Sequence, residues 1–315
     1  MTYQRFCKGV GRALFRKIVE NFRRIKSIQK LINFRDSVFY HQFRLSGVAR
    51  GRAFAETLKP HNGQSYCFTI AFNTPWVIDV ITKAWLTFPT GMTLVVVDNS
   101  SKPAASTAIE EICRERDIPY FRLPRNFERN PSRSHGVSQN WVFHNIVKHL
   151  KPDVFGFIDH DCFPIGPINI AERIVGKAGY GLPLPARSTY LYKSQQDERS
   201  WFYWAGLCFF RFVRVEHLNL DFRTRLDLGM DTGGGNWPLL YSMPSADEFE
   251  MARQEFLPID VGGEAAIFQI FDGALLHIGG ASYNRLKKEA EYRRLLSDHI
   301  WTTYLGGIQD RISRV

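Results

Sequence analysis

The chain has 315 residues, of which 44% are hydrophobic and 23% are charged, and this balance is typical of a soluble globular protein with a sizeable core. It contains no run of eighteen apolar residues, so the sequence predicts no transmembrane helix. Its five cysteines lie far apart and form no C-x-x-C pair, which argues against a disulfide framework or a structural zinc site. A reducing, cytoplasmic compartment is therefore expected.

The net charge of +10 is concentrated at the N-terminus. Residues 1–52 contain thirteen Lys and Arg but only two acids, so they carry +11 and the remainder of the chain carries −1. Nucleic-acid binders usually spread basic residues over a folded surface, so the near-neutral remainder argues against a nucleic-acid partner. The start of the chain lacks the apolar segment of a secretory signal, while an Arg-rich mitochondrial transit peptide remains an alternative.

Apolar residues recur at helical spacing through the basic segment, which predicts an amphipathic helical extension over residues 1–60. Two interpretations stay open. The extension lies peripherally on the inner, anionic face of a membrane through residues 1–52, or its apolar stripe packs on the protein's own body. The main domain is expected over residues 61–315, after a linker near 57–65. The apolar positions are Phe6, Val10, Leu14, Ile18, Phe22, Ile25 and Ile32.

From residue 66 the chain alternates between strand-like and helical segments. Such alternation predicts an α/β fold with a doubly wound, mostly parallel sheet, in which ligands bind outside the carboxyl ends of the strands. Pro75 is suited to the first turn of a helix. Strands are expected over residues 66–73, 93–101, 118–124 and 154–161, with helices over 76–88, 104–116 and 134–150.

The later half of the chain, residues 167–315, has a more mixed pattern. It is expected to add strands to the same sheet and to form the acceptor side of a cleft whose nucleotide side is residues 61–166. The expected elements are a strand over 201–212, a helix opening near Asp231, two short strands within 266–282 and a closing helix over 291–305.

The stretch VFGFIDHDCFPIG, residues 154–166, is an apolar strand that ends in two acids, Asp159 and Asp161. Residues two apart in a strand face the same side, so the carboxylates are expected to converge while His160 points away. Two converging carboxylates repel each other, and Mg²⁺ or Mn²⁺, which favour carboxylate and phosphate oxygens, would remove that penalty. The alternative is that both acids are turn residues.

This stretch resembles the D-x-D strand of GT-A glycosyltransferases, particularly the large family-two group, and the resemblance covers most of residues 66–282. CFTIAFN and VVVDNSS are similar to the first two strands of that family, and RSHGVSQNWVF is similar to its helix beside the nucleotide. The segments WAGLCFFRF, MDTGGGNWPLL and LLHIGGAS are similar to its acceptor-side strand, its acidic helix start and its late His segment. The implied fold is the Rossmann-like GT-A fold.

The resemblance implies a hexosyl-type glycosyltransferase that moves a sugar from a nucleotide-diphosphate sugar to a glycan or lipid-linked acceptor, with inversion. It implies that Asp161 and His277 hold Mn²⁺ or Mg²⁺ against the donor diphosphate. Asp231 is the implied base that deprotonates the acceptor hydroxyl. The implied nucleotide-sugar contacts are Phe72, Asp98, His135 and Asp159.

The proposed base departs from the family pattern, because members usually carry Glu-Asp where this chain has Met230-Asp231. Asp227, Glu248 and Glu264 therefore remain possible substitutes.

Structural interpretations also stay open. Asp231 could cap a helix, Asp98 could belong to a turn, and His277 could be a hydrogen-bonded core residue. Contact with a ligand and a purely structural role both stay open for His135, Trp201, Trp204, Trp237 and the glycines 233–235.

Other functions fit the sequence less well. A sugar nucleotidyltransferase is expected to carry a Gly-rich phosphate loop after its first strand, but that position reads FNTPWVID. A D-x-D phosphohydrolase places its first Asp after the opening strand, whereas the present acids follow the fourth. A catalytically degenerate GT-A protein that acts as a membrane-surface binding module remains the alternative outside enzymes.

Overall fold

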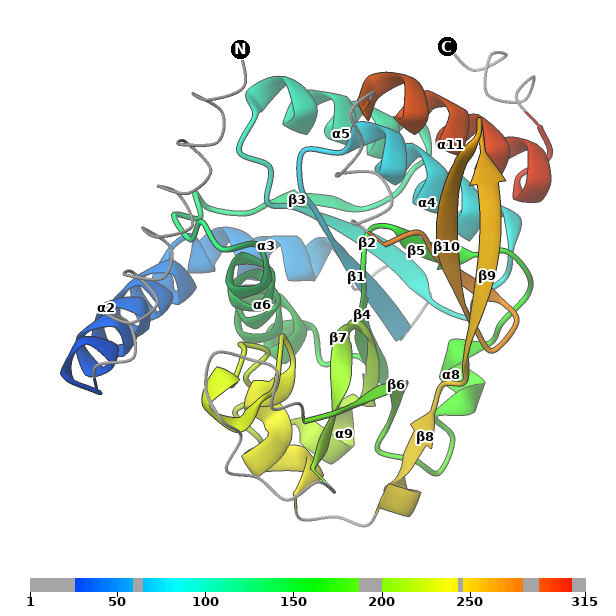
Figure 1. Cartoon of the computed structure of the whole chain (residues 1–315). Helices are drawn as coiled ribbons and strands as arrows, with labels where there is room; N and C mark the ends of the chain where they lie inside the picture. The colour runs from blue at the N-terminus through cyan, green and yellow to red at the C-terminus, as the bar shows by residue number, and fades with distance from the viewer. Residues whose placement is uncertain (1–25, 59–64, 187–199, 243–245, 280–288, 308–315) are drawn as a thin grey trace, which may run out of the picture. The chain divides into compact units, whose positions relative to one another are not determined.

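The computed structural model of the chain describes residues 26–58, 65–186, 200–242, 246–279 and 289–307 (Figure 1). The chain divides into two compact units, one up to Ser46 and one from Gly47 onward. Among the described residues, no helix combines the length and apolarity that a bilayer crossing requires.

The first unit contains helix α2 (Lys26–Leu45). It lies in the basic segment where a helix was expected, and its Phe34, Val38 and Leu45 fall at helical spacing along one face. Residues 1–25, which hold most of the predicted amphipathic stripe, lie outside the described residues. The division between extension and main domain near residue 60 stays a prediction.

Helix α3 (Val48–Leu58) belongs to the second unit. A Cβ added at Gly51 would come within 2.8 Å of the Trp141 ring, so the glycine permits close packing of α3 on a later helix. The Tyr66 hydroxyl donates a hydrogen bond to the carbonyl of Leu58 at 2.7 Å. Helix α3, which is the end of the predicted extension, thus packs against residues of the main domain.

Within the described residues the central sheet has seven strands, and most neighbouring pairs are parallel. The four expected strands form its parallel half, and β7 joins β4 antiparallel. The expected α/β class is therefore confirmed. In spatial order the strands are β3 (Tyr120–Arg122), β2 (Thr93–Asp98), β1 (Ser65–Ala71), β4 (Val154–Ile158), β7 (Trp201–Arg211), β6 (Gly179–Pro185) and β8 (Phe249–Met251).

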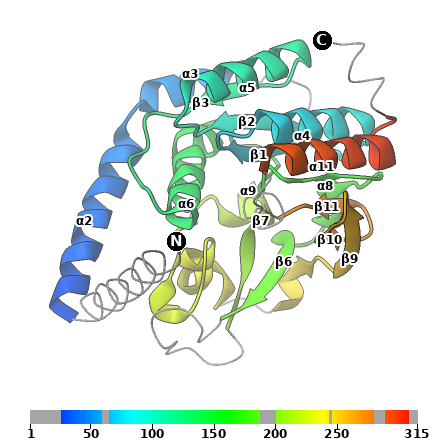
Figure 2. The same ribbon diagram turned by 45° about the horizontal axis from the view of Figure 1, so that its top comes forward.

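Helices cover the two faces of the parallel half (Figure 2). Inward residues of α4 (Pro75–Thr87) and α5 (Pro103–Glu115) share a core with Cys67 and Ala71 of β1. Phe143, which follows α6 (Pro131–Val142), stacks on Phe155 of β4, whose side chain points to the other face. Each of these helices has a proline in its first turn, as predicted at Pro75.

In the part of the chain that the structure describes, a second, antiparallel sheet has four strands in the order β5 (Cys162–Pro164), β11 (Leu275–His277), β10 (Glu264–Phe271) and β9 (Gln254–Val261). Helix α11 (Glu289–Tyr304) packs along β9 and α4 (Figure 2). The prediction that the later half extends one sheet is right for β6–β8 and wrong for β9–β11. The chain leaves β4 through a turn, so β5 starts the separate sheet to which the late strands pair.

The helix expected near Asp231 is irregular. A 3₁₀ turn, η3 (Gly234–Asn236), leads into a π-helical turn, η4 (Trp237–Tyr241), because the three glycines that precede it disfavour a regular α-helix. The remaining elements are η1 (Phe143–Val147), α7 (Lys148–Leu150), α8 (Ile170–Arg173), α9 (Phe212–Val215), η2 (Leu226–Leu228) and η5 (Ala246–Glu248).

Candidate functional site

Asp159 and Asp161 lie in a turn that joins the two sheets. Strand β4 ends one residue before Asp159, and the N–H of Cys162 donates to the Asp159 carbonyl at 2.9 Å, which closes a four-residue turn. The N–H of Asp159 donates to the carbonyl of Gly206 on β7, also at 2.9 Å. The backbone of both acids thus belongs to a turn, as the alternative interpretation held. The expectation that strand alternation places the two side chains on one side is wrong, because neither acid belongs to β4.

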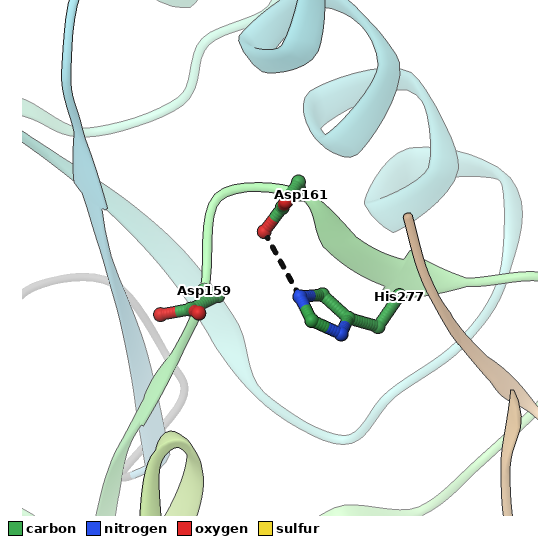
Figure 3. Close-up of side chains that lie close together, drawn as sticks. All are labelled: Asp159, Asp161 and His277. Carbon is green, nitrogen blue, oxygen red and sulfur yellow. Dashed lines mark ion pairs between the residues drawn. The ribbon is translucent and has the colours of Figure 1, made fainter. Parts of the chain in front are cut away.

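The two acids nevertheless lie near each other, and the Asp161 carboxylate faces His277 (Figure 3). One ligand atom from each of Asp159, Asp161 and His277 lies within 4.8 Å of the other two. His277 Nε2 is 3.4 Å from Asp161 Oδ1, and both residues are buried. Residues far apart in the sequence meet because His277 on β11 pairs with Cys162 on β5, directly after the turn.

Gln269 fixes the orientation of the His277 ring. It is the cross-strand partner of His277 on β10, and its Oε1 is hydrogen-bonded to His277 Nδ1 at 2.5 Å. A carbonyl oxygen can only accept, so Nδ1 carries the proton and Nε2 points toward Asp161. This is the usual support of a metal-binding histidine, whose other ring nitrogen donates to a protein oxygen.

The three groups have displaced pKa values. Burial raises the pKa of Asp159 to about 6, and the charge of Asp161 adds to this effect. Burial alone would also raise the pKa of Asp161, but the adjacent His277 lowers it overall. Burial alone would lower the pKa of His277, and the Asp161 carboxylate raises it overall. The positive charge that His277 carries when protonated thus offsets part of the negative charge of the two carboxylates, and a divalent cation could take its place.

The donor set suits a hard divalent cation. Two carboxylates and one imidazole offer oxygen and nitrogen ligands with a net negative charge, the combination that Mn²⁺ and Mg²⁺ accept. Neighbouring ligands of Mg²⁺ lie about 2.9 Å apart and opposite ligands about 4.2 Å apart, and any three ligands include at least two neighbouring pairs. Asp161 and His277, at 3.4 Å, are near this spacing, whereas direct ligation by Asp159 as well would require its carboxylate to move closer.

His135 on α6 borders the cluster from the other side. Its Nε2 lies 3.3 Å from Asp159 Oδ1 and 2.8 Å from Gln139 Nε2, which also donates to the Ala205 carbonyl at 2.7 Å. Because an amide nitrogen only donates, His135 Nε2 accepts from Gln139 and the ring is neutral. Burial lowers the pKa of His135 to about 4, in agreement with this state. Its expected nucleotide contact stays a prediction.

Asp231 is close enough to the cluster for its charge to help raise the pKa of Asp159. Its Oδ1 accepts the N–H of Thr232 at 2.8 Å, and its carbonyl accepts the N–H of Gly234 at 2.8 Å. Gly233, with φ of +99°, occupies the position before the 3₁₀ turn, so Asp231 is not the cap of that turn. Its role as a base stays a prediction.

The three substitute bases have other surroundings. Asp227 is paired with Arg225 at 2.8 Å and Glu248 with Arg214, both at the surface. Glu264 is exposed at the start of β10.

Phe72 and Asp98, the residues expected beside the nucleobase, follow β1 and end β2. The Phe72 side chain is 47% exposed at the carboxyl edge of the sheet. Asp98 is only 1% exposed. Its Oδ1 accepts the Ser100 N–H at 2.8 Å, and its Oδ2 accepts from the Tyr120 hydroxyl at 2.9 Å. A nucleobase contact by Asp98 stays a prediction, and it would require at least one of these hydrogen bonds to be exchanged.

The tryptophans named from the sequence divide by their contacts. Trp204 lies against His277, with ring centroids 4.8 Å apart, and Trp201 packs within an aromatic group around Tyr241. Gly206 makes room for the Trp204 ring, since a Cβ there would lie 2.3 Å from it. Gln269 and Gln139 are the site residues that sequence reasoning missed. Nothing in the local sequence marks either glutamine as a site residue. Gln269 is hydrogen-bonded to His277 on the neighbouring strand, and Gln139 to His135 one helical turn earlier.

No protein-family model matches this chain, and no curated protein matches it in sequence. Three solved structures of glycosyltransferases are distantly similar to it. S. aureus TarS matches with a TM-score of 0.33 and 13% sequence identity, over 52% of this chain and 32% of TarS. The bifunctional WbbM in its apo form matches with a TM-score of 0.39 and 9% identity, over 60% of this chain and 39% of WbbM. The mannosyltransferase PcManGT from Pyrobaculum calidifontis, in complex with GDP-Man and Mn²⁺, matches with a TM-score of 0.35 and 12% identity, over 63% of this chain and 61% of PcManGT.

The chain therefore spans between about a third and three fifths of the length of these proteins. At such TM-scores the similarity assigns no activity to this chain and no role to any of its residues.

Proposed function

We propose that the protein is a GT-A type glycosyltransferase that moves a hexosyl group from a nucleotide-diphosphate sugar to a glycan or lipid-linked acceptor, with inversion at the sugar carbon. The observation that carries the proposal is the meeting of Asp159, Asp161 and His277 directly after β4. In a sheet of this order, the crevice outside the carboxyl ends of β1 and β4 is where ligands of open α/β folds bind.

A divalent cation in this cluster would supply positive charge to the departing diphosphate. Asp161 and His277 would hold it, and Asp159 would contact the donor ribose or reach the cation through a water. Asp231 would remove the proton of the acceptor hydroxyl as that oxygen attacks the sugar carbon. His135, neutral at pH 7, would donate from Nδ1 to the donor.

The first test is the thermal stability of the protein with UDP, GDP, dTDP or CMP, each with and without Mn²⁺. A ligand that binds only the folded state at a hundred times its Kd stabilises it by about 2.7 kcal/mol. We expect one nucleotide to raise the Tm in the presence of Mn²⁺ only, and Asp161→Asn to abolish the rise. Asp117→Asn, an exposed change at the opposite edge of the sheet, is the matched control.

A flat response to every nucleotide in folded protein would contradict the proposal. Nucleotide binding without release of nucleotide from any nucleotide sugar, when panels of donors and acceptors are supplied, would instead identify a catalytically degenerate protein.

Contact of residues 1–52 with an anionic membrane is a separate proposal, and it rests on their net charge of +11. We expect the protein to sediment with vesicles that contain phosphatidylserine, less so at high salt, and not with neutral vesicles. Equal binding to both kinds of vesicle would contradict it.

A further inference from the structure

The small sheet has two unlike faces. Cross-strand partners in an antiparallel sheet point to the same side, and alternate residues of a strand point to opposite sides. Phe268 of β10 and its partner Leu257 of β9 are on the face that α11 covers, where the Phe268 ring lies near His299. The opposite face carries Gln269 and His277.

A single row of side chains on this opposite face connects the candidate metal site with the edge of the sheet. His277 of β11 is the partner of Gln269 on β10, and Gln269 is the partner of Phe256 on β9. Neighbouring strands are about 4.8 Å apart, so Phe256 lies roughly 10 Å from His277 along the row. The first two residues of the row are hydrogen-bonded to each other, and the third is 65% exposed.

Apolar side chains surround Phe256 on the same face. Ile267, two residues before Gln269, is 56% exposed, and its cross-strand partner Pro258 is also exposed. We call Phe256, Pro258 and Ile267 the apolar platform. Exposed aliphatic and aromatic groups at one spot of a sheet are costly in water unless a ligand covers them, and here they continue directly from the site's own histidine.

The surroundings of the platform restrict what can cover it. Residues 254–271 contain no Lys or Arg and three acids, of which Asp260 is on the face of the platform, so an anionic membrane or a nucleic acid would be repelled. An exposed Phe can bury about 200 Å² at most, and one Phe, one Ile and one Pro fall well short of the roughly 800 Å² per partner of a stable protein interface. A small apolar group, an alkyl or aryl chain, fits this size and charge.

We propose that the acceptor carries an apolar group beside its reacting hydroxyl, and that the apolar platform binds that group. The inference rests on the proposed glycosyl transfer at the neighbouring cluster, and it narrows the acceptor class to glycosides or alcohols with an alkyl or aromatic aglycone. The roughly 10 Å between Phe256 and His277 is a distance that one sugar unit and the start of its aglycone span.

The experiment compares the binding of methyl and n-octyl β-D-glucoside, the latter below its micelle concentration, by calorimetry with UDP and Mn²⁺ present. The readout is the ratio of the two affinities, which does not require glucose to be the natural sugar. Burying even two methylene groups strengthens binding roughly tenfold, so we expect at least that ratio in the wild type. The variant Phe256→Ala/Ile267→Ala should reduce the ratio to near one. Val175→Ala/Val213→Ala, which also removes two exposed apolar side chains, should leave it unchanged.

Three results would overturn the inference: equal affinities in the wild type, a ratio that survives loss of the platform, or a ratio lost equally in the control variant. Self-association that Phe256→Ala abolishes would also overturn it, because a second copy would then occupy the platform. Mn²⁺-dependent nucleotide binding, measured on the same proteins, separates the two proposals. If nucleotide binding is present but the octyl and methyl glucosides bind equally well, only the proposed acceptor class is wrong. If nucleotide binding is absent, the proposed glycosyl transfer itself fails.

Discussion

His277 and Gln269 are joined by a hydrogen bond across two neighbouring strands, and this bond aims the other nitrogen of the histidine at Asp161. A metal-binding histidine commonly has this arrangement. Both ring nitrogens also have protein partners and the residue is buried, as in a hydrogen-bonded core histidine, so ligation by His277 stays a prediction.

The first prediction concerns this support. Gln269→Leu keeps a side chain of roughly similar size but removes the acceptor, so His277 Nδ1–H loses its partner and the ring loses its fixed tautomer. We expect the affinity for Mn²⁺, measured by titration of its paramagnetic resonance signal, to fall about 10- to 100-fold.

Gln269→Glu, which retains an acceptor, should preserve the Mn²⁺ affinity. Gln254→Leu, the equivalent change on β9, should have no effect. Unchanged Mn²⁺ binding in Gln269→Leu would show that the hydrogen bond has no role in the site.

The second prediction concerns the base. Asp231→Asn removes the proton acceptor but keeps the hydrogen bond to Thr232, so binding of nucleotide with Mn²⁺ should be unaffected. We expect kcat to fall about 10²- to 10⁴-fold, measured as release of nucleotide from the donor that the stability screen identifies. Asp117→Asn, an exposed change at the opposite edge of the sheet, is the control and should retain wild-type kcat. If Asp231→Asn keeps its activity, Asp227, Glu248 or Glu264 becomes the candidate base.

The third prediction concerns acid stability. Burial alone would raise the pKa of Asp221, but hydrogen bonds from Arg223 and Asn140 hold it below its ordinary value. A carboxyl with a depressed pKa in the folded state stabilises fully above its unfolded pKa of about 3.9, and the stabilisation is lost as the pH falls through the folded pKa. Asp221→Asn should therefore reduce the free energy of unfolding by about 2 kcal/mol at pH 7.

The difference between Asp221→Asn and wild type should shrink below about pH 4, as followed by urea unfolding at several pH values. Asp227→Asn is the matched control. It removes an acid paired with an arginine two residues away at an exposed position, where the loss should be under about 1 kcal/mol. A constant difference between Asp221→Asn and wild type at all pH values would show that the charge of Asp221 is not the cause.

The fourth prediction sets helix propensity against packing. Gly136 lies inside α6, where alanine is favoured over glycine by about 1 kcal/mol. A Cβ at this position would lie 2.5 Å from the carbonyl oxygen of Phe222, a backbone atom that cannot rotate away. Overpacking costs about 1–3 kcal/mol, so Gly136→Ala should destabilise the protein.

Urea unfolding would measure this change, with Gly166→Ala as the control because a Cβ there meets nothing within 4 Å. A more stable Gly136→Ala protein would mean that the segment around Phe222 yields, and that His135 beside it is less firmly placed than the structure indicates.

Local sequence patterns were sufficient to predict the strands and helices of the parallel half of the sheet. Continuous apolar runs and helical periodicity gave β1, β2, β4, α4 and α5 to within a few residues, because hydrophobic patterning is a property of neighbouring positions. The same signals placed Asp159 and Asp161 at the carboxyl end of β4, where a ligand site was expected. They also indicated the short late strand that carries His277.

Only the tertiary structure decided how these parts meet. The pairing of β11 with β5 brings His277 to a turn more than a hundred residues earlier, and no local pattern specifies the register of two strands so far apart. For the same reason the separate small sheet, the support by Gln269 and the row that ends at Phe256 could not be read from the sequence. The hydrogen bond from the Ser100 N–H to Asp98 is the local turn contact that the sequence allowed, whereas the bond from the Tyr120 hydroxyl was equally hidden, since it depends on the pairing of β3 with β2. The sequence alone thus determined which acidic residues follow the strands of the parallel half, while long-range strand pairing determined which side chains share a site.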